Sequence, residues 1–211
     1  MAAPIMQRRY TQAEYLDYER QAEYKSEYIA RQIVAMSGVS YEHSLINGNL
    51  ARVLSTQTLD GPCAVHASDL RVKVRTRGMY TYPDIVVVCG APQFEDAHVD
   101  TLLNPTVIIE VLSPSTEGYD RGAKFGYYRA LPSLQEYLLV TQDQALVEHF
   151  VRAGDDWILS VADDLAAVVQ LPAISCTLPL AEIYRRVSFP PDPEAEGPAA
   201  ADTAKIGGAQ R

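Results

Sequence analysis

The sequence predicts one α/β domain over residues 1–189, and two apolar runs are the main reason. Ile85–Val88 and Val107–Ile109 are continuous rather than alternating, which is typical of strands covered on both faces. Apolar residues at helical spacing precede the first run, and a helix is expected after the second. With 211 residues the chain is long enough for one sizeable core. We therefore expect the two runs to be central strands of an α/β sheet.

Local signals predict the remaining elements. Thr11 and Glu14 match a capping box, which indicates a first helix. Ser113-Pro114-Ser115 ends a strand, and the helix after it is expected to reach about Leu131. In chain order the other expected elements are a helix at Thr11–Gln21, a hairpin of Lys25–Ala30 and Gln32–Ser37, a helix at Tyr41–Thr58, and strands at Cys63–Ala67, Asp69–Arg75, Asp84–Cys89, Thr106–Leu112, Leu134–Thr141, Ala145–Arg152 and Trp157–Val161.

The end of the chain has a different composition. Residues 190–211 are rich in Pro, Ala and Gly and nearly free of large apolar side chains. Such a segment buries too little surface to offset the entropy lost on ordering. We expect it to be a disordered tail.

The net charge of −9, from 18 basic and 27 acidic residues, argues against tight sequence-independent binding to nucleic acid. It leaves room for a small acidic active site. One basic strip stands out, because Arg71, Lys73, Arg75 and Arg77 alternate and would share one face of a strand. We interpret the strip as the solvated face of an edge strand, with a phosphate contact as the alternative.

Nothing in the sequence indicates a membrane or secreted protein. No segment approaches the roughly 20 apolar residues of a membrane span, and the N-terminus turns charged too early for a signal peptide. Cys63, Cys89 and Cys176 are odd in number and widely spaced, so neither a disulfide framework nor a zinc cluster is expected. We interpret Cys89 as a small core residue, and we expect a cytoplasmic protein.

Three charged residues on or beside the two apolar runs are candidates for an active site. Asp84 heads the first apolar run, Glu110 interrupts the second, and Lys124 lies on the helix that follows. Two carboxylates on neighbouring buried strands, with a lysine nearby, can bind a divalent metal and activate water for attack on phosphorus.

Each of the three also has a structural interpretation. Asp84 alone would fit an aspartate that accepts backbone hydrogen bonds where a strand begins. A buried Glu110 costs several kcal/mol unless it is paired, so a salt bridge with Lys124 or Arg129 is an alternative. Lys124 is also four residues after Asp120, the spacing of a simple helix ion pair.

Several stretches of the chain resemble the PD-(D/E)XK nuclease superfamily, and more closely its Uma-two family of restriction endonuclease-like proteins. They cover most of the chain between Arg9 and Arg186. The stretches are Glu27 with its hairpin, Glu42-His43, Tyr82-Pro83-Asp84, Glu110 to Thr116 (EVLSPST), and Asp120 to Tyr128.

The resemblance implies a restriction-endonuclease-like core, which is a central mixed β-sheet flanked by helices. It implies a metal held by Asp84, Glu110 and the backbone carbonyl of Val111, the residue after Glu110. It also implies that Glu27 reaches the same site from an earlier element. Mg²⁺, or Mn²⁺ in its place, is the expected ion.

The chain departs from the superfamily motif at Leu112, where the motif expects lysine. The Uma-two pattern shares this departure, and Lys124 is expected to supply the ammonium from the next helix. The hairpin has Ala30-Arg31 where the family usually has Asp-Gly, so we expect an altered tight turn.

We therefore expect a metal-dependent endonuclease, an endodeoxyribonuclease that hydrolyses phosphodiester bonds. The substrate is nucleic acid, with DNA expected from the fold analogy alone. The catalytic residues would be Glu27, Asp84, Glu110 and Lys124. A homodimer is plausible because cutting two strands takes two sites. The alternative is a nuclease fold that binds a partner or nucleic acid without cleaving it, which the acidic balance and the displaced lysine favour.

Overall fold

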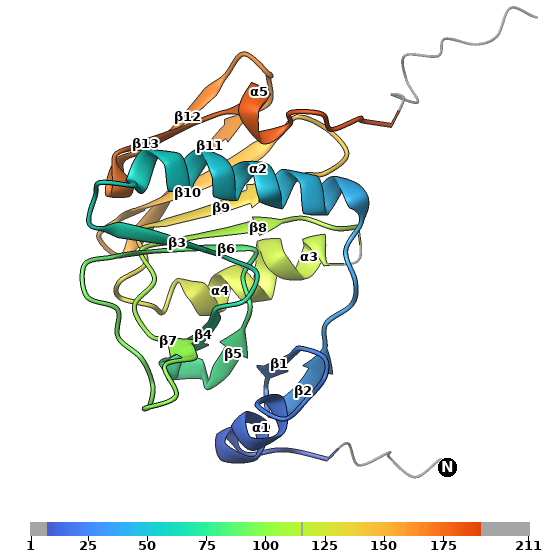
Figure 1. Cartoon of the computed structure of the whole chain (residues 1–211), viewed down its shortest axis with the longest axis vertical. Helices are drawn as coiled ribbons and strands as arrows, with labels where there is room; N and C mark the ends of the chain where they lie inside the picture. The colour runs from blue at the N-terminus through green and yellow to red at the C-terminus, as the bar shows by residue number, and fades with distance from the viewer. Residues whose placement is uncertain (1–7, 115, 191–211) are drawn as a thin grey trace, which may run out of the picture.

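The computed structural model describes residues 8–114 and 116–190. Its centre is a six-stranded mixed sheet in the order β11-β10-β9-β8-β6-β3, in which β8 and β9 are parallel and the other neighbours antiparallel (Figure 1). The strands are β3 (Cys63–Ala67), β6 (Ile85–Cys89), β8 (Val107–Val111), β9 (Glu136–Val140), β10 (Val147–Ala153) and β11 (Asp156–Ala162).

Both faces of this sheet are covered. One face packs against α2 (Tyr41–Thr58), α5 (Leu180–Ile183) and the hairpin of β12 (Val168–Leu171) and β13 (Cys176–Pro179). The other face packs against α4 (Phe125–Tyr128) and β4 (Arg71–Val74). Alternate residues of each central strand enter the two cores, which is why the apolar runs are continuous. The predicted α/β architecture with central covered strands is confirmed.

A second sheet carries the N-terminal hairpin. Its order is β2-β1-β5-β4-β7, with β1 at Ser26–Ile29, β2 at Gln32–Ala35, β5 at Met79–Thr81 and β7 at Thr101–Leu102. Helix α1 (Gln12–Glu19) packs on it through a cluster of Tyr15, Tyr28 and Tyr80. Because successive strand residues point to opposite faces, Glu27 points away from this cluster.

The N-terminal elements agree closely with the sequence. Thr11 caps α1 and forms the predicted capping box with Glu14. Helix α2 and β3 have the predicted bounds. The hairpin keeps a two-residue turn, in which Ala30 and Arg31 both have positive φ (50° and 68°), so the expected alteration of the turn is wrong.

The structure contains short elements that the sequence analysis missed. These are β5, β7, β12, β13 and α5, each of four residues or fewer. The helix after β8 is also divided, with α3 (Glu117–Tyr119) and α4 separated by a π-helical turn at Asp120–Lys124. The predicted tail lies outside the described residues, apart from Pro190. Within the described ranges no helix is long and apolar enough to cross a membrane.

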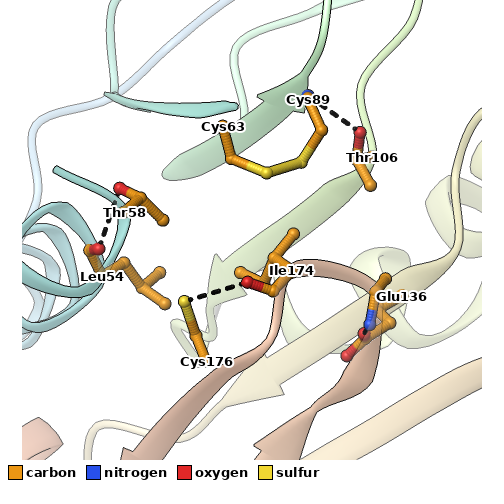
Figure 2. The surroundings of a disulfide bond; sticks show 9 residues. Leu54, Thr58, Cys63, Cys89, Thr106, Glu136, Ile174 and Cys176 are labelled. Atoms are coloured by element: carbon orange, nitrogen blue, oxygen red, sulfur yellow. Dashed lines mark hydrogen bonds between the residues drawn. A yellow bond between two sulfur atoms is a disulfide. The ribbon is translucent and has the colours of Figure 1, made fainter. Parts of the chain in front are cut away.

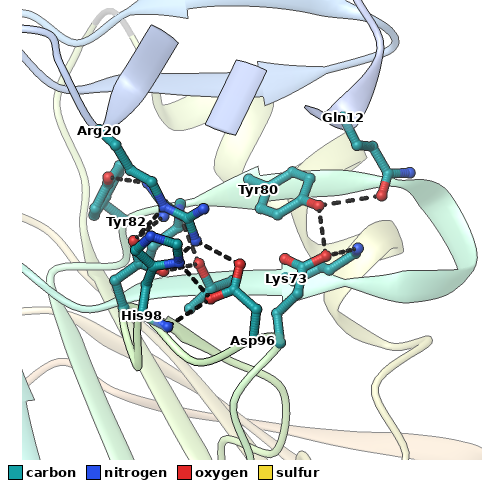
Figure 3. Close-up of polar contacts among 11 residues, drawn as sticks. Gln12, Arg20, Lys73, Tyr80, Tyr82, Asp96 and His98 are labelled. Carbon is teal, nitrogen blue, oxygen red and sulfur yellow. Dashed lines mark hydrogen bonds and ion pairs between the residues drawn. The ribbon is translucent and has the colours of Figure 1, made fainter. Parts of the chain in front are cut away.

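The basic strip on β4 is not an edge. β4 lies between β5 and β7, and Arg71 is only 3% exposed. Its guanidinium pairs with Asp100 at 2.9 Å and donates to the Tyr82 hydroxyl at 2.9 Å. Lys73 pairs with Glu95, which also accepts a hydrogen bond from Tyr80 (Figure 3). The edge-strand interpretation is wrong because β4 is paired on both sides and acidic partners neutralise Arg71 and Lys73. Arg75 and Arg77 lie beyond β4 on an exposed 3-10 turn and do not continue its face.

The expectation that the cysteines form no disulfide is wrong, and with it the interpretation of Cys89 as a simple core residue. Cys63 and Cys89 lie directly opposite each other on β3 and β6, with Cα atoms 4.0 Å apart, and form a disulfide (Figure 2). Residues 26 apart become neighbours only through the antiparallel register of two strands. Cys176 is buried and free.

Candidate active site

A pocket of about 650 Å³ lies where the β1–β2 hairpin, the start of α2 and the ends of β6 and β8 meet the segment from Thr116 to Lys124. All four predicted catalytic side chains line it. The predicted site residues among its lining are Glu27, Asp84, Glu110, Val111 and Lys124. The tertiary structure therefore brings together residues separated by almost a hundred positions in sequence.

Glu110 and Lys124 form a buried pair at the floor of the pocket. The Lys124 ammonium lies 2.9 Å from Glu110 Oε1, and their side chains are 8% and 5% exposed. The Tyr128 hydroxyl donates to the same carboxylate oxygen at 2.7 Å. Two donors therefore hold a carboxylate that interrupts an otherwise apolar strand.

Asp84 is held from two sides just before β6 begins. Its Oδ2 accepts the backbone N–H of Val111 at 2.8 Å, so it lies beside the residue that follows Glu110. Its Oδ1 lies 2.9 Å from His43 Nε2, in the first turn of α2. The other ring nitrogen of His43 is buried and has no hydrogen-bond partner among the described residues. These contacts fix the direction in which the Asp84 carboxylate points.

Two further carboxylates surround the lysine. Lys124 Nζ lies 3.5 Å from Glu27 Oε1 and 3.4 Å from Asp120 Oδ1. Glu27 also accepts a hydrogen bond from the Thr81 hydroxyl on the neighbouring strand β5. One ammonium thus contacts carboxylates from three different elements.

The floor of the pocket carries more negative than positive charge. Burial, together with the nearby Asp84 and Asp120, raises the pKa of Glu110 to about 8 despite the ammonium of Lys124. Burial also raises the pKa of Asp120. Although burial opposes its charge, the surrounding carboxylates hold the pKa of Lys124 well above its ordinary value. The lysine is therefore a fixed cation, and the carboxylates around it favour a proton or a further cation.

The π-helical turn positions the lysine. Such turns are rare and are frequently found at functional sites. The Tyr137 hydroxyl on β9 donates to the carbonyl of Asp120 at 3.2 Å, which fixes the turn against the sheet. Asp120 and Lys124, four residues apart, then both face Glu110.

The structure adds groups whose roles the sequence did not assign. His43 contacts Asp84, Tyr128 contacts Glu110, and Asp120 contacts Lys124. The helical spacing of Asp120 and Lys124 was the one signal for the last contact. The contact of His43 joins residues 41 positions apart, and no local pattern indicates it.

No group of three or more His, Cys, Asp or Glu side chains is arranged to hold a metal ion in the described part of the chain. Asp84 and Glu110 both line the pocket, and Asp84 accepts the backbone N–H of Val111, the residue after Glu110. A metal at this pocket would therefore have two side-chain carboxylates as its main protein ligands.

Comparisons with known proteins identify the family. A family model described as "Putative restriction endonuclease" matches residues 12–181, a range that contains every pocket residue named above. The chain belongs to the Uma2 family. The resemblance seen in the sequence is thereby confirmed.

Two proteins of Synechocystis are similar to this Uma2 chain. Protein sll1609 of Synechocystis, an uncharacterized protein, is 41% identical over 151 residues, which is 71% of this chain and 85% of the relative. A second uncharacterized Synechocystis protein, slr1290, is 35% identical over 180 residues, covering 83% and 92% of the two chains.

The Uma2 fold also matches a solved structure. A crystal structure from Anabaena variabilis, described as a putative nuclease belonging to DUF820, superposes with a TM-score of 0.69 at 20% identity. The match covers 82% of this chain and 97% of the other. At that identity the likeness establishes the fold, which is the predicted mixed sheet flanked by helices.

Proposed function

We propose that this Uma2 protein is a metal-dependent endonuclease that hydrolyses phosphodiester bonds in DNA. One observation carries the proposal: four carboxylates, Glu27, Asp84, Glu110 and Asp120, line one pocket around a single ammonium, that of Lys124. A purely structural cluster would be expected to balance its charges, because unpaired buried charge is costly. The excess of negative charge suits a divalent cation.

The donors fit Mg²⁺ or Mn²⁺. Both ions prefer oxygen ligands, and Mg²⁺ is commonly held by one or two carboxylates, with water and substrate phosphate completing its shell. Asp84 and Glu110, with the carbonyl of Val111, would hold it here. A bound ion of this kind polarises a phosphoryl oxygen and lowers the pKa of bound water.

The residues of the chain would then have distinct tasks. The Lys124 ammonium would stabilise negative charge on the phosphoryl oxygens and orient the attacking water. Glu27 would accept a proton or complete the shell of the metal, held in place by Thr81. His43 and Tyr128 would keep Asp84 and Glu110 in position. Hydrolysis adds one water across a P–O bond and leaves a phosphate monoester and a hydroxyl.

One observation favours a second function, a nuclease fold that binds without cleaving. Glu110 Oε1 already has the Lys124 ammonium at 2.9 Å and the Tyr128 hydroxyl at 2.7 Å, so this carboxylate has partners without a metal ion. The net charge of −9 also weakens general attraction to nucleic acid.

Thermal unfolding with and without millimolar Mg²⁺ or Mn²⁺ tests the proposal. We expect the ion to raise the melting temperature of the wild type and of Asp60→Ala, an exposed control, and not of Asp84→Ala. Cleavage of single- or double-stranded DNA by the wild type, lost in Asp84→Ala, would complete the test. No shift and no cleavage with either ion would favour the binding function.

A further inference from the structure

One wall of the pocket is apolar. Ile29, Val34, Met36 and Val39 line it, from the β1–β2 hairpin and the loop that leads to α2. Val34 and Val39 are 47% and 61% exposed, so this wall is accessible to a bound molecule. These four residues are called the apolar wall below.

The apolar wall adjoins the predicted chemistry directly. Val34 lies opposite Glu27 in the register of the hairpin, and directly opposed residues share one face of a sheet. Ile29 shares that face as well, since it is two residues from Glu27. A phosphate at the carboxylates would therefore have its attached nucleoside next to apolar side chains.

The charges of the pocket do not suit a duplex. Among the described residues that line it, Lys124 is the one lysine and there is no arginine, whereas four are carboxylates. Duplex binding is dominated by cations that neutralise phosphates on both strands. Arg121, in the segment that lines the pocket, already pairs with Glu148 at 3.0 Å.

The burial of the charged residues in the pocket also argues against a duplex substrate. The side chains of Glu110 and Lys124 are 5% and 8% exposed, so a scissile phosphate must enter the pocket to reach them. A pocket of about 650 Å³ has the volume of a site that encloses a small ligand, which suits one nucleotide and is too small to enclose a paired duplex. An unpaired nucleotide can leave the stack and enter, as in enzymes that act on extruded or single-stranded bases.

We infer that the substrate is single-stranded DNA, with the base beside the scissile phosphate packed on the apolar wall. This inference rests on the proposed nuclease function. Apolar contact with a base is tolerant of sequence, because every base has an apolar face. Cutting a single strand takes one site, so this chain needs no second copy for it.

Cleavage of matched substrates tests the inference. A labelled single-stranded oligonucleotide and the same strand in a duplex are incubated with the protein and Mg²⁺ or Mn²⁺. We expect the single strand to be cut at least about tenfold faster. Equal or faster cutting of the duplex would overturn the inference and leave the proposed function standing, whereas no cutting of either would count against that function itself.

Variants locate the contact. Val34→Ser with Met36→Ser should lower kcat/KM for the single strand by about tenfold, mainly through KM, because the contact is made in ground and transition states alike. The control is Ile158→Ser with Val161→Ser, which are similarly exposed on β11 and lie outside the pocket lining. An equal effect of the two double variants would overturn the assignment.

A binding measurement shows whether the protein prefers single-stranded or duplex DNA even if cleavage is slow. Fluorescence anisotropy in Ca²⁺, which also takes oxygen ligands, measures both oligonucleotides without relying on cleavage. Tighter binding of the single strand, weakened by the change at Val34 and Met36, supports the inference. Equal or tighter binding of the duplex overturns it.

Discussion

Lys124 is the residue on which the electrostatics of the site depend. It contacts Glu27, Glu110 and Asp120 and is 6% exposed. Opposite charge at this distance is worth much more in a buried site than in water. The lysine therefore links stability to the proposed chemistry, because the same ammonium holds the carboxylates together and faces the pocket.

Replacing this lysine should destabilise the protein strongly. We expect Lys124→Met to lower the free energy of unfolding by about 3 to 5 kcal/mol at neutral pH, because it leaves buried carboxylates without their cation. Arg121→Met is the control three residues away, and removing this half-exposed ion-pair partner should cost less than about 1 kcal/mol. Urea unfolding measures both, and a Lys124→Met variant as stable as wild type would show that the ammonium does not stabilise the cluster.

The raised pKa of Glu110 predicts a pH dependence. Its pKa is about 8 in the folded protein against an ordinary 4.5. Between pH 4.5 and pH 8 the folded protein therefore keeps a proton on Glu110 that the unfolded chain has lost. Stability should therefore fall as the pH rises from about 5 to 8 and then level off. Mg²⁺ needs the deprotonated carboxylate, so its stabilising effect should be larger at pH 8.5 than at pH 6. Melting temperatures at the two pH values, with and without Mg²⁺, measure both effects. In the Glu110→Gln variant, the stabilisation by Mg²⁺ should no longer differ between pH 6 and pH 8.5.

At the scale of elements, two irregular backbone segments position the charged side chains of the pocket. The π-helical turn directs Lys124 at the carboxylates, and a tight hairpin turn holds Glu27 over the same pocket. Both are places where the chain departs from regular geometry, and sequence periodicity describes only the regular parts of a helix or strand.

The hairpin turn can be improved. Ala30 and Arg31 both adopt the left-handed conformation, which is unfavourable for residues with a Cβ atom. Ala30→Asn with Arg31→Gly should stabilise the protein by about 1 kcal/mol, because Asn-Gly is the preferred pair for a two-residue turn of this kind. Thermal or urea unfolding measures the gain. Arg31→Ala keeps the Cβ atom and should show no gain; a gain there would mean that charge, rather than backbone conformation, was responsible.

At the scale of the whole molecule, contacts distant in sequence join the layers. Arg20 of the segment after α1 pairs with Asp96 at 2.7 Å and Asp100 at 2.8 Å, and Arg71 of β4 pairs with the same Asp100 (Figure 3). This network ties the N-terminal helix to the second sheet. Glu27, on β1, therefore belongs to a sheet that these ion pairs hold in place.

The disulfide should contribute measurably to stability. It closes 26 residues between β3 and β6, and a link of that length is expected to stabilise by about 3 kcal/mol. A reducing agent should lower the melting temperature of the wild type. The Cys63→Ser, Cys89→Ser double variant should start from the lower value and be insensitive to reductant. Equal melting temperatures for the wild type in both conditions would contradict a stabilising role.

Most regular elements were predictable because their signals are local. The capping box at Thr11, the bounds of α2 and the continuous apolar strands β6 and β8 all follow from neighbouring residues. The short strands β7 and β12 were missed, because two to four residues carry too little periodicity to be recognised. They form because a neighbouring strand offers hydrogen bonds.

The sequence by itself determined the central covered strands, which follow from local pattern, and the family, which follows from its motifs. The prediction of Asp84, Glu110 and Lys124 began from residue type and position, whereas that of Glu27 came from the family resemblance alone. Only the tertiary structure decided which groups meet: the disulfide, the burial of Arg71, the contact of His43 with Asp84, and the apolar wall beside Glu27. The physical reason is register and packing, since a strand pairing or a layer contact joins residues whose separation in sequence carries no signal of their distance in space.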